Sequence, residues 1–265
     1  MSPSPLARIL TDAIERTLDY RVAIAFSGGL DSATLAAVAK EKVETHLITI
    51  SAGESPDLLA AREAAAALGL PLQEVVLDEK TIENTAQHCQ RLMDGTLTDL
   101  ELMAGLWHVA EAAKEAGFKT LLTGSGAEET FIGYNKYYEA HDRGLDLQAV
   151  LDEEIRTLPS RDLMRAQMVC RHWEVEVRTP FLDEELLKAV RAVPISERIG
   201  TREMKKPLLR KLAAELGVPD CARLRPKKAM QYGSGMHKVM EKMHKEGRLK
   251  TEPNRVPEWL KEKRE

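Results

Sequence analysis

The sequence has few of the features that mark secreted, membrane-spanning or cysteine-rich proteins. Its 265 residues include three cysteines, Cys89, Cys170 and Cys221, which lie far apart and form no CxxC pair. We therefore interpret them as reduced, buried thiols and expect no disulfide framework or cysteine metal site. No apolar run approaches the ~20 residues of a bilayer span, and the opening MSPSPLARIL lacks the basic flank and apolar run of a secretion signal. These absences predict a cytoplasmic protein with no membrane segment.

Neither sign of charge dominates the chain. Lys and Arg number 38 and Asp and Glu number 42, which gives a formal net charge of -4. This balance argues against a generic nucleic-acid coat, although it is compatible with a local basic patch. With 43% hydrophobic and 30% charged residues, the composition fits a globular protein with one substantial core or two modest ones.

Strand-like and helix-like segments alternate through the first half of the chain. A helix is expected at 5–18, and strand-length apolar runs lie at 22–26, 45–50, 72–77 and 119–124. Helical patterns follow three of these runs, at 30–40, 55–70 and, as a pair, at 81–92 and 98–116. This alternation predicts an α/β fold with a doubly wound parallel sheet.

From about Gly144 the strand signals fade, and 147–193 reads as helices interrupted by the extended segment EVEVRTPFLD. The remainder is helical and basic in places. We therefore predict an α/β domain at 1–140 and a mostly helical portion at 141–265 that completes the ligand site of that domain. The boundary is soft, and a single domain is the alternative.

A glycine pair follows the first strand, in the stretch VAIAFSGGLDS. Ligands of open parallel sheets collect at the carboxyl ends of the strands, where Ser27, Gly28 and Gly29 fall. Glycines let backbone N–H groups approach an anion, the helix that begins near Leu30 points its positive end there, and Ser32 adds a hydroxyl. Phosphate is the expected ligand, and the alternative is that the glycines only turn a strand into a helix. The spacing fits neither a Walker loop nor the GxGxxG dinucleotide motif.

The motif SGGLDS resembles the pyrophosphate loop, or PP-loop, of the ATP pyrophosphatases, which share the adenine nucleotide α-hydrolase-like fold and cleave ATP into AMP and pyrophosphate. Three further segments, LLTGSGAEETFIGY, EVRTPFLDEELLKAV and RPKKAMQYGSG, resemble segments of asparagine synthetases and occur in that family's order. Together with SPDL after the second strand, the resemblance covers about residues 22–235.

The resemblance implies an ATP-dependent carbon–nitrogen ligase that adenylylates a carboxylate, transfers an amine and releases AMP and pyrophosphate. ATP and Mg²⁺ are the implied substrate and metal, with small-molecule carboxylate and amine substrates. The loop residues implied to hold pyrophosphate and Mg²⁺ are Ser27, Gly28, Gly29, Asp31 and Ser32. Across the site, Gly124 matches a nucleotide-binding position and Glu128 a second metal-binding carboxylate. Lys227 matches the lysine that neutralises charge developing on the phosphates, so the implied catalytic set is Lys227, Asp31 and Glu128.

Each of these positions also has a plainer interpretation. Glu128 and Glu129 fit the first turn of a helix, where carboxylates complement the dipole, and Lys227 lies in RPKK, a stretch typical of a solvated basic face. Asp183 and Arg178 are interpreted as structural. The spacing of Met236, Met240 and Met243 indicates core packing.

The chain departs from the family at two points. Asparagine synthetases that use glutamine begin with a glutaminase domain, whereas only about twenty residues precede Val22 here. We therefore expect free ammonia, another amine, or a separate glutaminase or ammonia-supplying subunit to provide nitrogen. In addition, Ser125 replaces the glutamate of the family's GEG, which puts asparagine as the product in doubt.

Two other functions remain open. One is a tRNA-modifying or sulfur-transferring enzyme of the same fold, which activates a base carbonyl; the other is a nucleotide-sensing subunit. A homodimer is also compatible with the sequence. Basic residues that could form a phosphate-tracking stripe for tRNA are Arg202, Lys205, Lys206, Arg210, Lys211, Arg223, Arg225, Lys227 and Lys228.

Overall fold

The computed structural model describes residues 3–226, 230–254 and 259 of the chain. At its centre is a five-stranded sheet with the order β3-β2-β1-β4-β5, in which every pair is parallel. The strands are β1 (Arg21–Ala25), β2 (Glu44–Ser51), β3 (Leu72–Val76), β4 (Thr120–Leu122) and β5 (Glu176–Arg178). This sheet confirms the predicted doubly wound α/β class.

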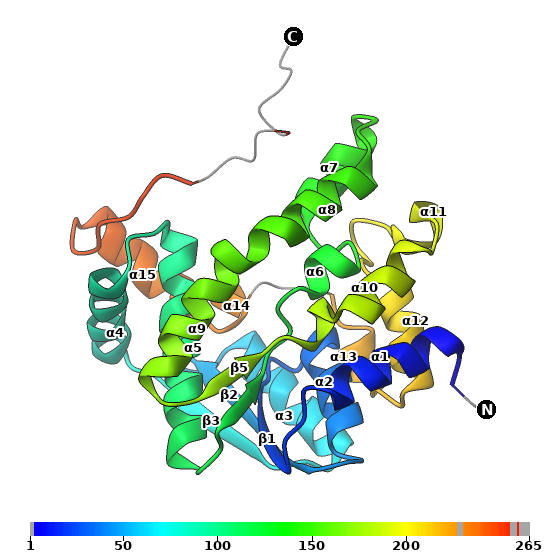
Figure 1. Cartoon of the computed structure of the whole chain (residues 1–265). Coiled ribbons are helices and arrows are strands. Elements are labelled where there is room, and N and C mark those ends of the chain that lie inside the picture. The colour runs from blue at the N-terminus through cyan, green and yellow to red at the C-terminus, as the bar shows by residue number, and fades with distance from the viewer. Residues whose placement is uncertain (1–2, 227–229, 255–258, 260–265) are drawn as a thin grey trace.

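Helices cover both faces of the sheet (Figure 1). The side chains of β1 alternate between the two cores, with Val22 and Ile24 in one and Ala23 in the other, as the pleat of a strand requires. The first core is completed by helices α1 (Pro5–Glu15), α2 (Leu30–Ala39), α3 (Pro56–Leu68), α10 (Glu184–Arg191), α12 (Pro207–Glu215) and α13 (Asp220–Arg223).

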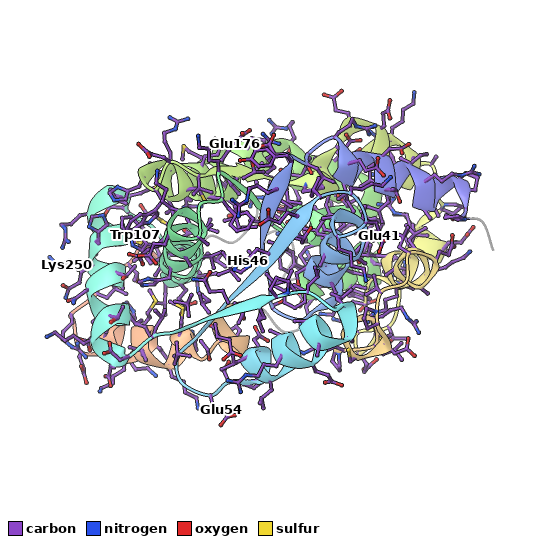
Figure 2. All side chains as sticks on the ribbon, turned by 90° about the horizontal axis from the view of Figure 1, so that it is seen from below. Glu41, His46, Glu54, Trp107, Glu176 and Lys250 are labelled. Carbon is purple, nitrogen blue, oxygen red and sulfur yellow. The ribbon has the colours of Figure 1, made fainter. Side chains whose placement is uncertain are left out.

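The second core lies on the opposite face. Its helices are α4 (Glu79–Leu92), α5 (Leu97–Glu115), α9 (Asp162–His172) and α15 (Met236–Lys245). Met236, Met240 and Met243 are fully buried there, which confirms their predicted packing role. Figure 2 shows β2, marked by His46, crossing the middle of the molecule, and Trp107 on α5 to one side of it. The Trp107 ring lies 4.4 Å from that of His172, so His172 has an aromatic packing role.

A helical pair extends the molecule beyond the sheet. Helices α7 (Asn135–Asp142) and α8 (Leu147–Thr157) project away from it in Figure 1 and enclose a third, smaller cluster with residues flanking α11 (Ile195–Arg198). The remaining short helices are α6 (Ala127–Thr130), α14 (Met230–Gly233), η1 (Leu158–Ser160) and η2 (Pro180–Leu182). No helix within the described ranges is both long enough and apolar enough to cross a membrane.

Local sequence signals account for several helix boundaries. Ser55 caps α3, with its hydroxyl accepting a bond from the Leu58 amide at 3.2 Å and Pro56 in the first turn, as predicted. Asp183 caps α10 in the same way and also binds Arg16 at 2.7 Å. The interpretation of Asp183 as a structural residue is therefore supported by its contacts.

The sheet crosses the expected boundary near residue 140. Strand β5 lies within the segment predicted only as extended, and it pairs with β4 through Thr120 and Glu176, Leu121 and Val177, and Leu122 and Arg178. The helices α10, α12 and α13 also pack in the same core as α1 and α2. The two predicted parts of the chain thus share one sheet and one core.

Candidate active site

The candidate site lies where the sheet order reverses, between β1 and β4. The chain passes from β1 to β2 and β3 on one side and then returns to β4 on the other. Neighbouring connections leave opposite faces at such a point, and a crevice forms beyond the carboxyl ends of the strands. Ser27 follows β1 and Gly124 follows β4, so each predicted binding loop begins where a strand ends. The two loops lie side by side, because a Cβ on Gly124 would be 3.1 Å from the Asp31 Cβ.

The loop after β1 is held in one conformation by short-range contacts. The Ser32 hydroxyl accepts a bond from the Ser27 amide at 3.3 Å and donates one to the Gly29 carbonyl at 3.3 Å. Gly28 has φ +67°, and a Cβ there would lie 2.4 Å from the Ala60 carbonyl carbon of α3. The loop is therefore pressed against α3 at a position that only glycine can occupy.

Arg225 joins this loop to α3 from the C-terminal half of the chain. Its guanidinium donates to the Ser27 carbonyl at 2.8 Å and to the Asp57 carboxylate at 2.6 Å. Asp57 belongs to the SPDL stretch and is 3% exposed. The segment that resembles the family's R-x-K stretch thus begins directly beside the SGGLDS loop.

The predicted metal ligands Asp31 and Glu128 converge on one point, which a lysine ammonium occupies. Lys206 Nζ donates to the two Asp31 oxygens at 2.8 and 2.7 Å and to Glu128 Oε1 at 2.6 Å. Burial disfavours the Lys206 ammonium, but the two carboxylates outweigh this effect and raise its pKa above the usual value. Lys206 is therefore a buried cation at the centre of the site.

The sequence did not single out Lys206. It was one member of the expected basic stripe, and nothing in the run MKKPLLR distinguishes it from Lys205. The available signal was Pro207, which opens α12 and fixes Lys206 as the residue before the helix. That signal gives the backbone position of Lys206 but not its burial.

Gly133 makes room for this ion cluster. A Cβ at position 133 would lie 1.6 Å from Glu128 Oε2 and 2.4 Å from Lys206 Cε. The FIGY turn after α6 therefore requires glycine because the carboxylate and the lysine pass directly over its backbone.

The residues present fit a magnesium ion that is shared with phosphates. No group of three or more His, Cys, Asp or Glu that could hold a metal occurs within the described part of the chain. Asp31 and Glu128 nevertheless place oxygens around one cation position, and Mg²⁺ is commonly held by one or two carboxylates together with substrate phosphates. The donor set thus suits a metal that arrives with a nucleotide.

A cavity of about 750 Å³ opens from the phosphate loop toward α5, α8 and α9. Such a volume lies within the range of small-molecule sites. Its apolar wall includes Ile48, Ile50 and Leu106, and its charged wall includes Glu129 and Arg161. The cavity is therefore large enough for a small-molecule ligand.

Ionic contacts order the far wall of the cavity. Arg165, 7% exposed, binds Asp99 at 3.1 Å, and the buried Glu154 accepts from Lys136 at 2.7 Å and Arg161 at 3.0 Å. These pairs fix the charges that a second substrate would meet.

Glu129 lies in the same cavity and is 4% exposed. Burial raises the pKa of its carboxyl group to about 7. Ser125 also lines this cavity, and its hydroxyl accepts a bond from the Thr123 hydroxyl at 3.1 Å. The glutamate that the family has at position 125 is thus replaced by a neutral hydroxyl, while a buried carboxyl remains four positions along the chain.

The structure brings together the predicted residues Ser27, Gly28, Gly29, Asp31, Ser32, Gly124 and Glu128 around this crevice. Lys227 lies outside the described residues, so its predicted role stays a prediction. Arg225, two positions before it, reaches the loop.

The asparagine synthase family model matches residues 6–165 and 145–258, which together cover most of the chain. The chain belongs to the asparagine synthase family. A relative from Methanocaldococcus jannaschii, named "Putative asparagine synthetase 1" (glutamine-hydrolyzing), is 29% identical over 94% of this chain and 52% of its own length. Asparagine synthetase B (glutamine-hydrolyzing) of Escherichia coli K12 is 27% identical over 87% of this chain and 45% of its own length. The chain thus spans about half the length of these family members.

A solved structure described as a predicted subunit of tRNA methyltransferase from Methanocaldococcus jannaschii is 20% identical, with a TM-score of 0.37, over 80% of this chain and 95% of its own. This likeness is too weak to bear on function. The family assignment rests on the sequence match.

Proposed function

We propose that this chain is an AMP-forming, ATP-dependent ligase that adenylylates a carboxylate and transfers the acyl group to an amine. Membership of the asparagine synthase family supports an ATP-dependent ligase or amidotransferase activity in general. The observation that carries the specific proposal is the convergence of Asp31 and Glu128 beside the SGGLDS loop. Two carboxylates at a phosphate loop require cations between them and the phosphates.

The chain's own groups fit the first step. The substrate carboxylate oxygen attacks the α-phosphorus of ATP, the bond from that phosphorus to the bridging oxygen breaks, and pyrophosphate leaves. Helix α2 begins directly after the Ser27–Gly29 loop, and the positive end of its dipole favours the negative charge that develops on the leaving pyrophosphate. Lys206 adds a buried positive charge beside the same loop. Fixed charges of this kind stabilise a transition state more than a ground state.

Magnesium, when bound by Asp31 and Glu128, would neutralise phosphate oxygens and polarise the phosphorus. In the second step the amine attacks the acyl carbon, the bond from that carbon to the AMP oxygen breaks, and the amine loses a proton. Ser125 cannot take this proton at neutral pH, because an unperturbed hydroxyl is not a base. We therefore propose an acceptor other than aspartate with free ammonia.

The nitrogen source stays a proposal: ammonia, another amine, or a separate glutaminase subunit. Both relatives described above are named as glutamine-hydrolyzing, and the chain matches about half of each. The cytoplasmic location and the homodimer likewise stay predictions from sequence.

The tRNA-modifying alternative receives little support from the surface. Its basic stripe needed Lys206 and Arg210 to face solvent, but they are 3% and 7% exposed. Arg225 is also held by Ser27 and Asp57. These three residues therefore serve the site interior, and the stripe expected from sequence is wrong as a continuous exposed surface.

Exchange of labelled pyrophosphate into ATP tests the proposal without knowledge of the amine. A panel of carboxylates is screened with ATP, Mg²⁺ and labelled pyrophosphate, and we expect exchange that depends on one class of carboxylate. Asp31→Asn should abolish the exchange, whereas Asp94→Asn, an exposed aspartate outside the cavity lining, should not. Formation of ADP and orthophosphate as primary products, seen by phosphorus NMR, would contradict the proposal.

A further inference from the structure

We propose that Lys206 occupies the magnesium position of the nucleotide-free protein, so that the metal binds only together with ATP. This inference rests on the proposed function, because it assigns the Asp31 and Glu128 carboxylates to a metal that accompanies ATP. It concerns the order of binding, which neither the family assignment nor the proposed reaction determines.

The contacts of Lys206 match those expected of a bound cation. An ammonium group has three donors, and the Lys206 ammonium makes three contacts of 2.6 to 2.8 Å, two with Asp31 and one with Glu128. A metal ion that took these same oxygens would lie within bonding distance of Nζ. The ammonium and the metal therefore exclude each other at this position.

The backbone holds Lys206 in place for this role. Lys206 has φ 57° and ψ 49°, a left-handed conformation that is unfavourable for a residue other than glycine. Its carbonyl accepts the Arg210 amide at 3.0 Å, which fixes it to the start of α12, and Gly133 leaves the space for its side chain. A strained backbone that delivers a 3% exposed lysine onto two carboxylates is a built feature of the site.

The neighbouring charges explain why metal alone would not displace the ammonium. A cavity of about 60 Å³ adjoins Lys206, and its lining includes Asp31 and three further cationic side chains, Lys205, Arg210 and Arg225. An ammonium that moved there without an anion would face two guanidinium groups. ATP brings phosphates to this cavity, and the ammonium then has a favourable place on their oxygens while the metal takes the carboxylates.

Manganese, a paramagnetic substitute for magnesium, allows binding to be measured without turnover. The electron paramagnetic resonance signal of free Mn²⁺ is followed while wild type, Lys206→Met and the exposed-lysine control Lys188→Met are added. Each titration is run with and without an ATP analogue that carries a methylene group between the α and β phosphorus atoms.

Without nucleotide, we expect Lys206→Met to bind Mn²⁺ at least about ten times more tightly than either wild type or Lys188→Met. The analogue should tighten Mn²⁺ binding by wild type at least about tenfold. It should tighten Mn²⁺ binding by Lys206→Met much less. A wild type that binds Mn²⁺ equally with and without the analogue overturns the inference, and so does a Lys206→Met variant with the affinity of wild type. Retention of tight binding in the double variant with Asp31→Asn also overturns it, because the metal is then elsewhere.

Equal Mn²⁺ binding by wild type with and without the analogue overturns the inference even where Lys206→Met does not fold. Failure of the proposed function has a different signature. If no carboxylate supports pyrophosphate exchange, but the analogue still tightens Mn²⁺ binding, the chemistry is wrong and the binding order stands. If exchange occurs and wild type binds Mn²⁺ equally well alone, the binding order is wrong and the chemistry stands.

Discussion

Gly28→Ala is expected to destabilise the protein because the phosphate loop is pressed onto α3. The left-handed φ of +67° costs an L-residue roughly 1–2 kcal/mol. The new methyl group would also lie 2.4 Å from backbone atoms of Ala60, and overpacking of this kind costs about 1–3 kcal/mol more. We expect the free energy of unfolding to fall by roughly 2–5 kcal/mol, which lowers the Tm by at least about 4 °C for a chain of this size.

Gly144→Ala is the matched control. Gly144 has φ +70°, and a Cβ there would meet no atom within 4 Å, so this variant should lose only the conformational part, about 1–2 kcal/mol. Urea unfolding measures both variants, and pyrophosphate exchange should be lost in Gly28→Ala alone. Equal destabilisation of the two would refute the close approach of the loop to α3.

Four further changes test the site. Asp31→Asn should abolish exchange and also lower stability by roughly 1–3 kcal/mol in urea unfolding, because Lys206 loses a charged partner but keeps Glu128; unchanged stability would contradict the ion cluster. Lys227→Met should slow exchange by a factor equivalent to roughly 3 kcal/mol while ATP binding stays near that of wild type, and equal kinetics would assign it to a solvated face. The raised Glu129 pKa means that the folded state binds the proton more tightly than the unfolded state does. The free energy of unfolding of wild type should therefore fall as the pH rises from about 4.5 to about 7, by up to about 1.4 kcal/mol per pH unit. In urea unfolding, Glu129→Gln should show a weaker dependence on pH over this range. Ser125→Glu should increase ammonia-dependent amide formation measured by mass spectrometry, and asparagine synthesis by wild type at about 1 per second or more would remove the need for a different acceptor.

The fold was predictable where apolar runs of strand length and helix-capping residues mark the elements. The apolar runs and caps of the first half gave β1 to β4 and α3 within a few residues of their observed bounds. Strand β5 was predicted only as an extended segment, because three residues are too few for a period and its partner β4 is more than fifty residues away.

The sequence predicted the two loops of the site, but it did not predict the buried lysine between the two carboxylates. SGGLDS marked Asp31 by its place after a strand, whereas Lys206 reaches that carboxylate from 175 residues away. The contacts of Asp31 with a buried lysine also give it a structural role that the motif alone does not indicate. Tertiary contacts of this length leave no local pattern in the sequence.

The same long separations set an order on folding. A chain emerging from the ribosome presents Asp31 and Glu128 long before Lys206 exists to neutralise them. It likewise presents Ser27 and Asp57 long before Arg225 exists to join them, and the outer edge of β4 stays open until residues 176–178 arrive. Contacts between distant residues form late, because their loop-closure entropy must be met first. The ion cluster is therefore completed late, and a chain interrupted before residue 206 would hold Asp31 and Glu128 without their cationic partner.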